Sequence, residues 1–432
     1  MEEALLNIVV TINSYLSNYV LIILLIGAGL YFTIRTRFVQ IRCFGEGWKR
    51  VFGGFSLFGK KEKSGMSSFQ ALTTAIAAQV GTGNIVGACG AILIGGPGAI
   101  FWMWLIAFLG MATNYAEAVL AQKTRIVDSE GIVHGGPVYY IKTAFRGKFG
   151  TFLAGFFSVA IILALGFMGC MVQSNSIAST CETAFGIPAW VWGIAVVAIA
   201  AYVFIGGVTF GILAALAQGA KRGLFSNEAG MGSTPHAHAQ ANVKNPHEQG
   251  TVALIGVFVD TFIVVTITAL VVISVLYTGN GALAQGAYEG IDKTNMAQLA
   301  FGSMFGEVGG NVFVAICLLF FAFSTILSWN LFAKINVQYL FGKKAVPVFT
   351  VIALIFIFMG SLLSNDLVWE LADMFNQLMV LPNVIGLIAL GGGVAACART
   401  AGKSWGKAAA KIEREHEEGI NTSNPDKPNW EA

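Results

Sequence analysis

Long apolar runs separated by short polar stretches dominate the chain. Most runs are about twenty residues long, enough for a helix rising 1.5 Å per residue to cross a bilayer core of roughly 30 Å. The pattern therefore predicts an all-α polytopic membrane protein. The predicted membrane segments are residues 19–34, 68–95, 98–121, 151–180, 187–208, 210–225, 252–277, 310–331, 345–363 and 367–398.

Composition supports this prediction. Of the 432 residues, 56% are hydrophobic and only 11% are charged, whereas soluble domains average about 25% charged residues. Such a chain cannot cover a soluble surface, which excludes a soluble enzyme, a disordered chain and a nucleic-acid-binding protein. We expect one transmembrane domain over residues 1–398 and a polar cytoplasmic tail over residues 399–432.

The distribution of Lys and Arg predicts the orientation in the membrane. Basic residues are frequent between the first two apolar segments and in the tail, whereas residues 278–309 contain only Lys293. Because Lys and Arg in short loops remain on the cytoplasmic side, we expect a multi-pass protein of the cell membrane with its N-terminus outside and its C-terminus in the cytoplasm.

Residue types that bind metals carry little signal. The six cysteines form no CxxC pair and lie mostly within or beside apolar runs, which is typical of packing residues. His236 and His238 form an HxH pair, but no carboxylate or cysteine is close in sequence. We predict no metal centre from these residues.

Two apolar segments are interrupted by glycines in a similar way. The first reads TTAIAAQVGTGNIVGACGAI, with Gly81 and Gly83 in its middle, and the second reads AQGAKRGLFSNEAGMGSTPHAHA, with Gly223, Gly230 and Gly232. Glycine can also serve close helix packing. However, paired broken helices are typical of secondary transporters with inverted repeats, because freed N–H groups suit a carboxylate and freed carbonyls suit a cation.

Three acidic residues in apolar surroundings need an explanation, because a charge at the membrane centre is costly. Glu117 lies near a predicted cytoplasmic helix end, where snorkelling or capping would account for it. Glu228 either braces the second interruption, paired with Arg222 or Lys221, or is a ligand. Asp260 lies in the following apolar segment.

Hydroxyl groups gather in the segment FSTILSWN, at Ser324, Thr325 and Ser328. Hydroxyls in helices commonly bond to the carbonyl of the preceding turn. A cation site is the alternative interpretation.

Several motifs resemble those of the alanine or glycine:cation symporter family, also called the sodium:alanine symporters. These motifs, spread over about residues 10 to 400, are QVGTGNIVG, GGPVYYI, MVQSNSIA, RGLFSNEAGMGSTPHAHA, GVFVDT and FSTILSWN. The resemblance implies a fold similar to the bacterial leucine transporter, with ten core helices in two inverted five-helix repeats and one additional helix.

The resemblance also implies the binding residues. The substrate residues would be Gly81, Thr82, Gly83, Gln173, Phe225, Ser226, Met231, Thr325 and Trp329. The amides of the first three would receive the substrate carboxylate, and Met231 and Trp329 would shorten the pocket to fit glycine or alanine. The sodium ligands would be the carbonyls of Ala77 and Val80 and the hydroxyls of Ser324 and Thr325, with Asn84 and Ser226 at a second sodium site.

The function implied is import of alanine or glycine together with Na⁺ by alternating access. We expect no enzymatic step and no cofactor other than Na⁺ as the coupling ion. The expected partners are a small amino acid, Na⁺ and the lipid bilayer, and no nucleic acid. A cation channel and a transport-inactive relative are the alternatives, and the sequence leaves open Na⁺ against H⁺ and alanine against glycine.

One feature departs from the resemblance. Lys148 and Lys244 are both assigned to the cytoplasmic side, which requires an even number of spans between them, but only three apolar segments separate them. In the family, a basic stretch and a further helix lie between the counterparts of Gly207 and Gly211, where this chain has only VTF. We therefore predict that the fifth core helix, which closes the first repeat, is missing.

Overall fold

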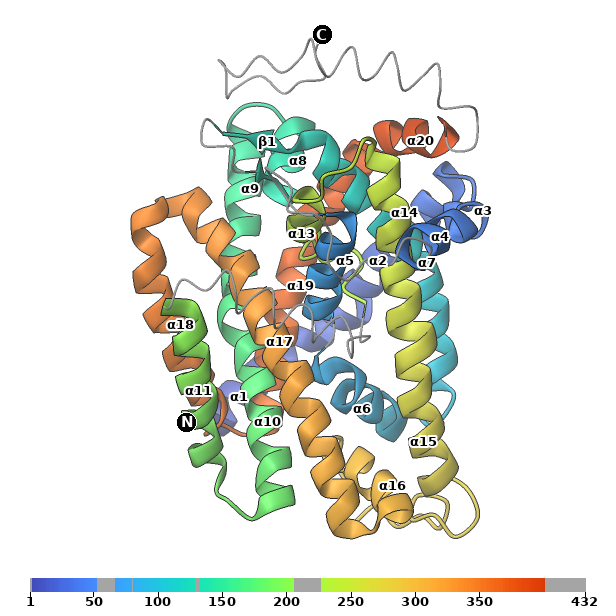
Figure 1. Ribbon diagram of the computed structural model, residues 1–432, viewed down its shortest axis with the longest axis vertical. Coiled ribbons are helices and arrows are strands. Elements are labelled where there is room, and N and C mark those ends of the chain that lie inside the picture. The colour runs from blue at the N-terminus through green and yellow to red at the C-terminus, as the bar shows by residue number, and fades with distance from the viewer. Residues whose placement is uncertain (1, 53–66, 80, 129–132, 206–226, 401–432) are drawn as a thin grey trace.

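The computed structural model describes residues 2–52, 67–79, 81–128, 133–205 and 227–400 (Figure 1). These residues form a bundle of long helices, and this confirms the predicted all-α polytopic membrane protein. Within these described ranges, six helical stretches are long and apolar enough to cross a membrane: Ala99–Thr124, Lys148–Phe185, Pro246–Leu276, Glu307–Phe341, Lys343–Gly360 and Asn365–Ala389.

Two of these stretches change their helical winding near the middle. The stretches divide into the following elements: α7 (Ala99–Thr124), α9 (Lys148–Ile161), α10 (Cys170–Phe185), α14 (Pro246–Val257), α15 (Thr266–Leu276), α17 (Glu307–Phe341), α18 (Val346–Gly360) and α19 (Asn365–Ala389). A π-helical segment, Ile162–Gly169, joins α9 to α10, and another, Phe258–Val265, joins α14 to α15. A 3₁₀ turn, Lys343–Ala345, precedes α18. Such π-helical segments often mark functional sites.

The first predicted interruption is present. Helix α5 (Ser68–Gln79) ends before Gly81, a short 3₁₀ turn follows at Thr82–Asn84, and α6 (Val86–Gly95) continues at an angle of 63° to α5. Taken as one bent span, α5 and α6 make a seventh candidate membrane crossing among the described residues.

Shorter elements complete the bundle and its ends. The helices are α1 (Glu2–Tyr15), α2 (Ile22–Arg35), α3 (Val39–Arg42), α4 (Phe44–Phe52), α8 (Pro137–Ala144), α11 (Ala189–Ile205), α13 (Pro235–Ala239), α16 (Met296–Phe305) and α20 (Gly391–Thr400). A π-helical turn, Leu16–Leu21, joins α1 to α2. Strands β1 (Ile126–Val127) and β2 (Val133–His134) pair antiparallel.

Two predicted segments differ from the observed helices. The segment 367–398 is not one helix, because α19 ends at Ala389 and α20 begins at Gly391, where the sequence GGG weakens helix continuation. Helical structure in the first segment begins at Glu2 rather than near residue 19, since α1 packs its buried Val9 and Asn13 inside the bundle and Asn13 Nδ2 donates to the Glu370 carboxylate at 2.6 Å.

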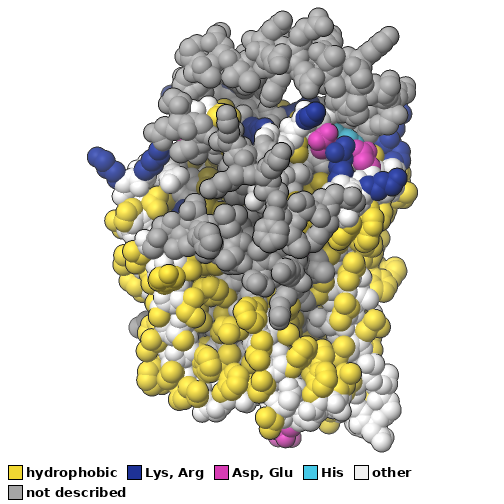
Figure 2. Space-filling model, in the orientation of Figure 1, with side chains coloured by type: hydrophobic (Ala, Val, Ile, Leu, Met, Phe, Trp, Pro, Cys, Tyr) yellow, Lys and Arg dark blue, Asp and Glu magenta, His cyan; other side chains and the backbone are white. Residues whose placement is uncertain are grey.

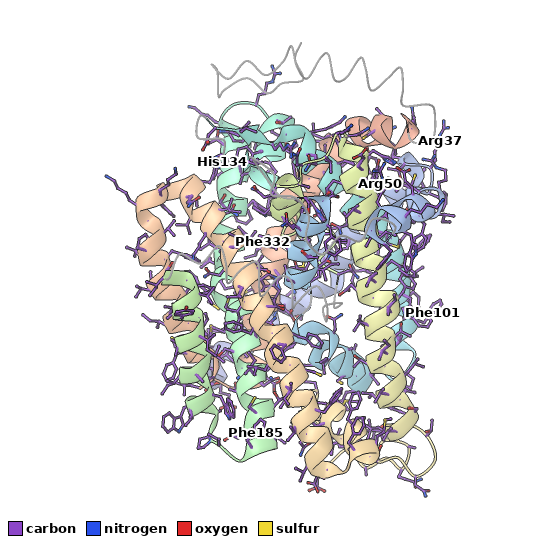
Figure 3. All side chains as sticks on the ribbon, viewed as in Figure 1. Arg37, Arg50, Phe101, His134, Phe185 and Phe332 are labelled. Atoms are coloured by element: carbon purple, nitrogen blue, oxygen red, sulfur yellow. The ribbon has the colours of Figure 1, made fainter. Side chains whose placement is uncertain are left out.

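The surface divides into an apolar body and a charged end. Figure 2 shows hydrophobic side chains over the lower two-thirds of this face and Lys and Arg at the upper end. Large apolar side chains face outward, such as Phe101, which is 60% exposed, and Phe185, which is 44% exposed, whereas Arg37 and Arg50 lie at the charged end (Figure 3). An apolar band of this kind suits contact with lipid.

The predicted segment 210–225, and with it most of the junction at which the fifth core helix would lie, falls outside the described residues.

Candidate functional site

The break between α5 and α6 brings backbone groups against a polar side chain of α10. The amide of Thr82 donates to Gln173 Oε1 at 3.0 Å, and both residues are buried. A methyl group on Gly81 would lie 2.8 Å from Gln173 Nε2 and 3.0 Å from Thr325 Oγ1. Any larger residue at position 81 would therefore have to displace the Gln173 amide and the Thr325 hydroxyl from the broken backbone.

The same break meets the hydroxyl segment of α17. Thr325 Oγ1 lies 3.1 Å from the carbonyl oxygen of Ala77 and 3.2 Å from that of Phe321. Ser324 Oγ donates to the carbonyl of Phe321 at 2.8 Å, the local helix bond that was the simpler of its two interpretations. Thr325 thus joins α17 to the C-terminal end of α5, where carbonyls lack helical partners.

Asp260 makes a second polar cluster, which includes Asn84 at the end of the 3₁₀ turn. Its buried carboxylate accepts from Asn84 Nδ2 at 3.2 Å and from Thr261 Oγ1 at 2.9 Å. Asn227 Nδ2 donates to Thr261 Oγ1 at 2.7 Å. Among the described residues, the buried oxygens Asn84 Oδ1 and Thr82 Oγ1 have no hydrogen-bond partner. The cluster therefore offers several oxygen atoms to a cation.

The second predicted interruption is held by Glu117 of α7. Gly230 and Gly232 have φ of 90° and 82°, values that favour glycine, and their amides donate to the Glu117 carboxylate at 3.1 and 2.9 Å. Asn383 Nδ2 of α19 donates to the same carboxylate at 2.7 Å. Glu117 is fully buried, so the snorkelling interpretation was wrong. The carboxylate does bind free backbone amides, as in the capping interpretation, but they belong to the second interruption and not to the end of its own helix.

Glu228 links the second interruption to α17. Trp329 Nε1 donates to Glu228 Oε1 at 2.6 Å, and Ser233 Oγ donates to the other carboxylate oxygen. The Trp329 ring packs against Gly169, where a methyl group would come within 2.5 Å of it. Glu228 therefore has partners other than the predicted Arg222 and Lys221, which lie outside the described residues.

The structure thus brings together part of the expected site. Gly81, Thr82, Gln173, Thr325 and Ala77 lie around the first break. Gly83 belongs to the 3₁₀ turn that follows. The remaining expected residues either contact other parts of the bundle or fall outside the described residues.

Met231 packs beside Ala28, Val380 and Val384, against α2 and α19. Asn84 contacts Asp260. The positions Val80, Phe225 and Ser226 lie outside the described residues.

Sequence reasoning missed the partners of the buried acids, namely Thr261, Asn227 and Asn383. In the sequence, each of them is only a polar residue within or beside an apolar run, and this does not indicate which residue it hydrogen-bonds to. The motif GVFVDT, which contains Asp260 and Thr261, was the nearest indication.

The two histidines of the HxH pair differ in their contacts: His238 Nδ1 lies 2.8 Å from Gln249 Nε2 and its buried Nε2 has no hydrogen-bond partner among the described residues, whereas both ring nitrogens of His236 have one. His236 Nδ1 lies 2.9 Å from the Ser233 carbonyl and Nε2 lies 2.9 Å from Asn336 Nδ2. Its ring stacks on Phe332, which Figure 3 places near the centre of the bundle. These contacts place His236 in a structural role.

The part of the chain that the structure describes is a helical membrane bundle with a broken span, and with backbone groups and buried carboxylates gathered at two interruptions, which is the architecture of a secondary transporter. The chain belongs to the sodium:alanine symporter family, whose sequence profile matches residues 2–211 and 208–405.

Three relatives illustrate this similarity. The chain is 34% identical to the sodium/alanine symporter AgcS of Methanococcus maripaludis, over 89% of this chain and 95% of that protein. It is 35% identical to the putative sodium/proton-dependent alanine carrier protein YrbD of Bacillus subtilis, over 88% and 89%. It is 33% identical to the probable sodium/glutamine symporter GlnT of the same organism, over 90% and 89%. The family makes this chain a cation-coupled amino acid transporter.

Proposed function

We propose that the chain imports alanine or glycine together with Na⁺ by alternating access. The observation that carries this proposal is the meeting of Gly81, Thr82, Gln173 and Thr325 at the break between α5 and α6. Backbone N–H and C=O groups that lack helical hydrogen-bond partners lie close together at this break, so an amino acid carboxylate and a cation could bind side by side.

The proposed carboxylate site uses the amides of Gly81, Thr82 and Gly83. Gln173 Oε1 accepts the Thr82 N–H, and a substrate carboxylate would replace it as the acceptor, with Gln173 turning its amide N–H toward the substrate. The positive N-terminal end of α6 favours the negative charge. The resemblance adds Phe225, Ser226, Met231, Thr325 and Trp329 as pocket walls that limit the side chain to that of glycine or alanine.

The proposed sodium site uses the carbonyl oxygens of Ala77 and Val80 and the hydroxyls of Ser324 and Thr325. Hard oxygen ligands of this kind suit Na⁺, and Thr325 Oγ1 keeps lone pairs while its hydrogen points to a carbonyl. Asn84 and Ser226 are proposed for a second sodium site. We add Asp260, because its carboxylate lies beside Asn84 and would balance the charge of the ion.

The wider architecture is also proposed. We propose the leucine-transporter-like inverted repeat, with its two broken helices facing each other. We place the bundle, residues 1–398, in the plasma membrane with the N-terminus outside, and residues 399–432 in the cytoplasm. The gathering of Lys and Arg at one end of the bundle supports this orientation (Figure 2).

A second candidate is a transport-inactive relative that lacks the fifth core helix. The family profile matches in two parts that meet at residues 208–211. The alignment with the archaeal symporter has 438 positions but includes only 89% of these 432 residues, which is about 384. About fifty aligned positions therefore face no residue of this chain. Without the fifth core helix, the binding residues would remain in place, but the substrate path through the bundle would not be enclosed on that side.

Uptake by purified protein in liposomes separates these functions. Labelled alanine should accumulate when an inward Na⁺ gradient is imposed and should not accumulate when K⁺ replaces Na⁺. A channel would give Na⁺ current without saturable alanine uptake. An inactive relative would give neither, and inserting the corresponding segment of the archaeal symporter between Gly207 and Gly211 should then restore uptake. If this chimera also failed while the archaeal protein transported, the proposed function would be wrong.

A further inference from the structure

A thiol, a carboxylate and an imidazole meet at the charged end of the bundle, away from the transport site. Cys43, Glu46 and His247 each offer one ligand atom, and these atoms all lie within 4.8 Å of one another. We call them the Cys43–Glu46–His247 cluster. Cys43 precedes α4, Glu46 lies in its first turn, and His247 lies in the first turn of α14.

The spacing of the three atoms is close to that of metal ligands. His247 Nε2 lies 3.3 Å from Glu46 Oε2. In a tetrahedral zinc site with bonds of 2.0–2.3 Å, two ligand atoms lie about 3.3 to 3.6 Å apart. The imidazole and the carboxylate already have this separation, and the thiol needs to move by no more than about 1.5 Å, within reach of one side-chain rotation.

The surroundings hold the ligands as supporting contacts do in known metal sites. Tyr115 Oη lies 2.7 Å from His247 Nδ1, which leaves Nε2 directed at the cluster. Arg50 binds the other carboxylate oxygen, Glu46 Oε1, at 3.0 Å, so that Oε2 faces His247 Nε2, the hydrogen-bond partner that a bound metal would replace. Contacts of this kind fix the ring orientation of metal-ligating histidines.

The cluster borders solvent through Glu46 alone. Cys43 and His247 are buried, but the Glu46 side chain is 35% exposed. Figure 2 shows acidic and basic side chains gathered around a histidine at this end, where Figure 3 labels Arg50.

We propose that the Cys43–Glu46–His247 cluster binds a divalent cation of borderline softness, such as Zn²⁺, and thereby joins α4 to the start of α14. One sulfur, one nitrogen and one oxygen ligand favour such ions over Na⁺, Mg²⁺ or Ca²⁺, which prefer oxygen alone. With three protein ligands, water occupies the fourth position. Because α14 leads into the span that contains Asp260, the bound metal would restrain that span.

Binding is tested with Co²⁺, which reports a thiolate ligand by its charge-transfer absorption. The full chain in detergent should bind one Co²⁺ with this absorption, and Zn²⁺ should displace it. Cys43→Ser should abolish the absorption and weaken Zn²⁺ binding at least about tenfold. Cys317→Ser, which changes a cysteine of α17 outside the cluster, is the matched control and should leave both unchanged.

Two further variants keep the test decisive if Cys43→Ser folds poorly. Glu46→Gln should weaken Zn²⁺ binding while the thiolate absorption remains. Tyr115→Phe removes the contact to His247 Nδ1 and should weaken Zn²⁺ binding by about ten- to a hundredfold. Thiolate absorption that is absent in the unmodified chain, or unchanged in Cys43→Ser, would overturn the proposal. This binding test does not depend on transport, so it stands or fails separately from the proposed function.

Discussion

The amide nitrogen of Thr82 lies 3.0 Å from Oε1 of Gln173, although ninety-one positions separate the two residues in sequence. The break in the α5–α6 span frees this amide, and α10 supplies its acceptor. An amino acid carboxylate that binds here must therefore compete with Gln173.

Replacing Gln173 with glutamate should weaken alanine uptake. The new carboxylate would lie close to the substrate carboxylate. Two like charges about 4 Å apart repel by roughly 1 kcal/mol in bulk water and by roughly 4 kcal/mol near a protein surface. We expect the KM for alanine to rise about tenfold or more, measured by uptake into liposomes. Ser174→Ala, on the next position of α10, is the control. An unchanged KM in Gln173→Glu would remove Gln173 from the substrate site.

Adding a methyl group at Gly81 should block transport without unfolding the bundle. The methyl carbon would lie 2.8 Å from Gln173 Nε2 and 3.0 Å from Thr325 Oγ1, so both side chains must move. Gly87→Ala is the matched control on α6, because its methyl carbon would meet Trp369 at an ordinary 3.5 Å. We expect uptake at least about tenfold lower in Gly81→Ala at equal yield of folded protein. Normal uptake would contradict the close approach at the break.

Removing the Thr325 hydroxyl should reduce the affinity for Na⁺. Loss of a bond from a neutral group to a charge costs about 1.5–3 kcal/mol, which corresponds to about a tenfold or greater change in affinity. The Na⁺ concentration for half-maximal uptake should rise accordingly in Thr325→Ala, while Thr325→Ser should remain near the unmodified chain. Equal Na⁺ dependence of all three proteins would remove Thr325 from the sodium site.

Neutralising Asp260 should uncouple uptake from Na⁺. Asp260→Asn keeps the size of the side chain near Asn84 and Thr261 but removes the charge that would balance a bound cation. We expect alanine uptake to lose most of its stimulation by Na⁺. The measurement is the ratio of uptake in Na⁺ to uptake in K⁺, with Asp366→Asn, on an exposed position of α19, as the control. A ratio equal to that of the control would show that Asp260 has a structural role only.

Glu117→Gln should destabilise the protein. The carboxylate accepts from the amides of Gly230 and Gly232 and from Asn383 Nδ2, whereas a glutamine has a single acceptor oxygen. At least one buried donor loses its partner, at a cost of about 1–3 kcal/mol. Thermal unfolding in detergent should occur at a lower temperature than for the unmodified chain. Glu182→Gln, on α10 away from this cluster, should not shift it.

The sequence alone determined the class of protein, the family and the two glycine interruptions. Apolar runs of the length of a bilayer leave few structures other than membrane helices, because every backbone polar group in lipid must be satisfied within the segment. Glycines in the middle of such a run mark where that rule is broken, which is why Gly81, Gly230 and Gly232 could be identified without coordinates.

Only the tertiary structure decided which side chains satisfy the freed groups. Glu117 was assigned to a helix end from its position in α7, yet it binds amides more than a hundred positions away. Cys43 and His247 lie in different parts of the chain and come together only because α4 packs beside α14. A hydrophobic pattern indicates which face of a helix is buried. The partner of a buried polar group depends instead on how helices that are distant in sequence pack together, and a local sequence pattern does not contain that information.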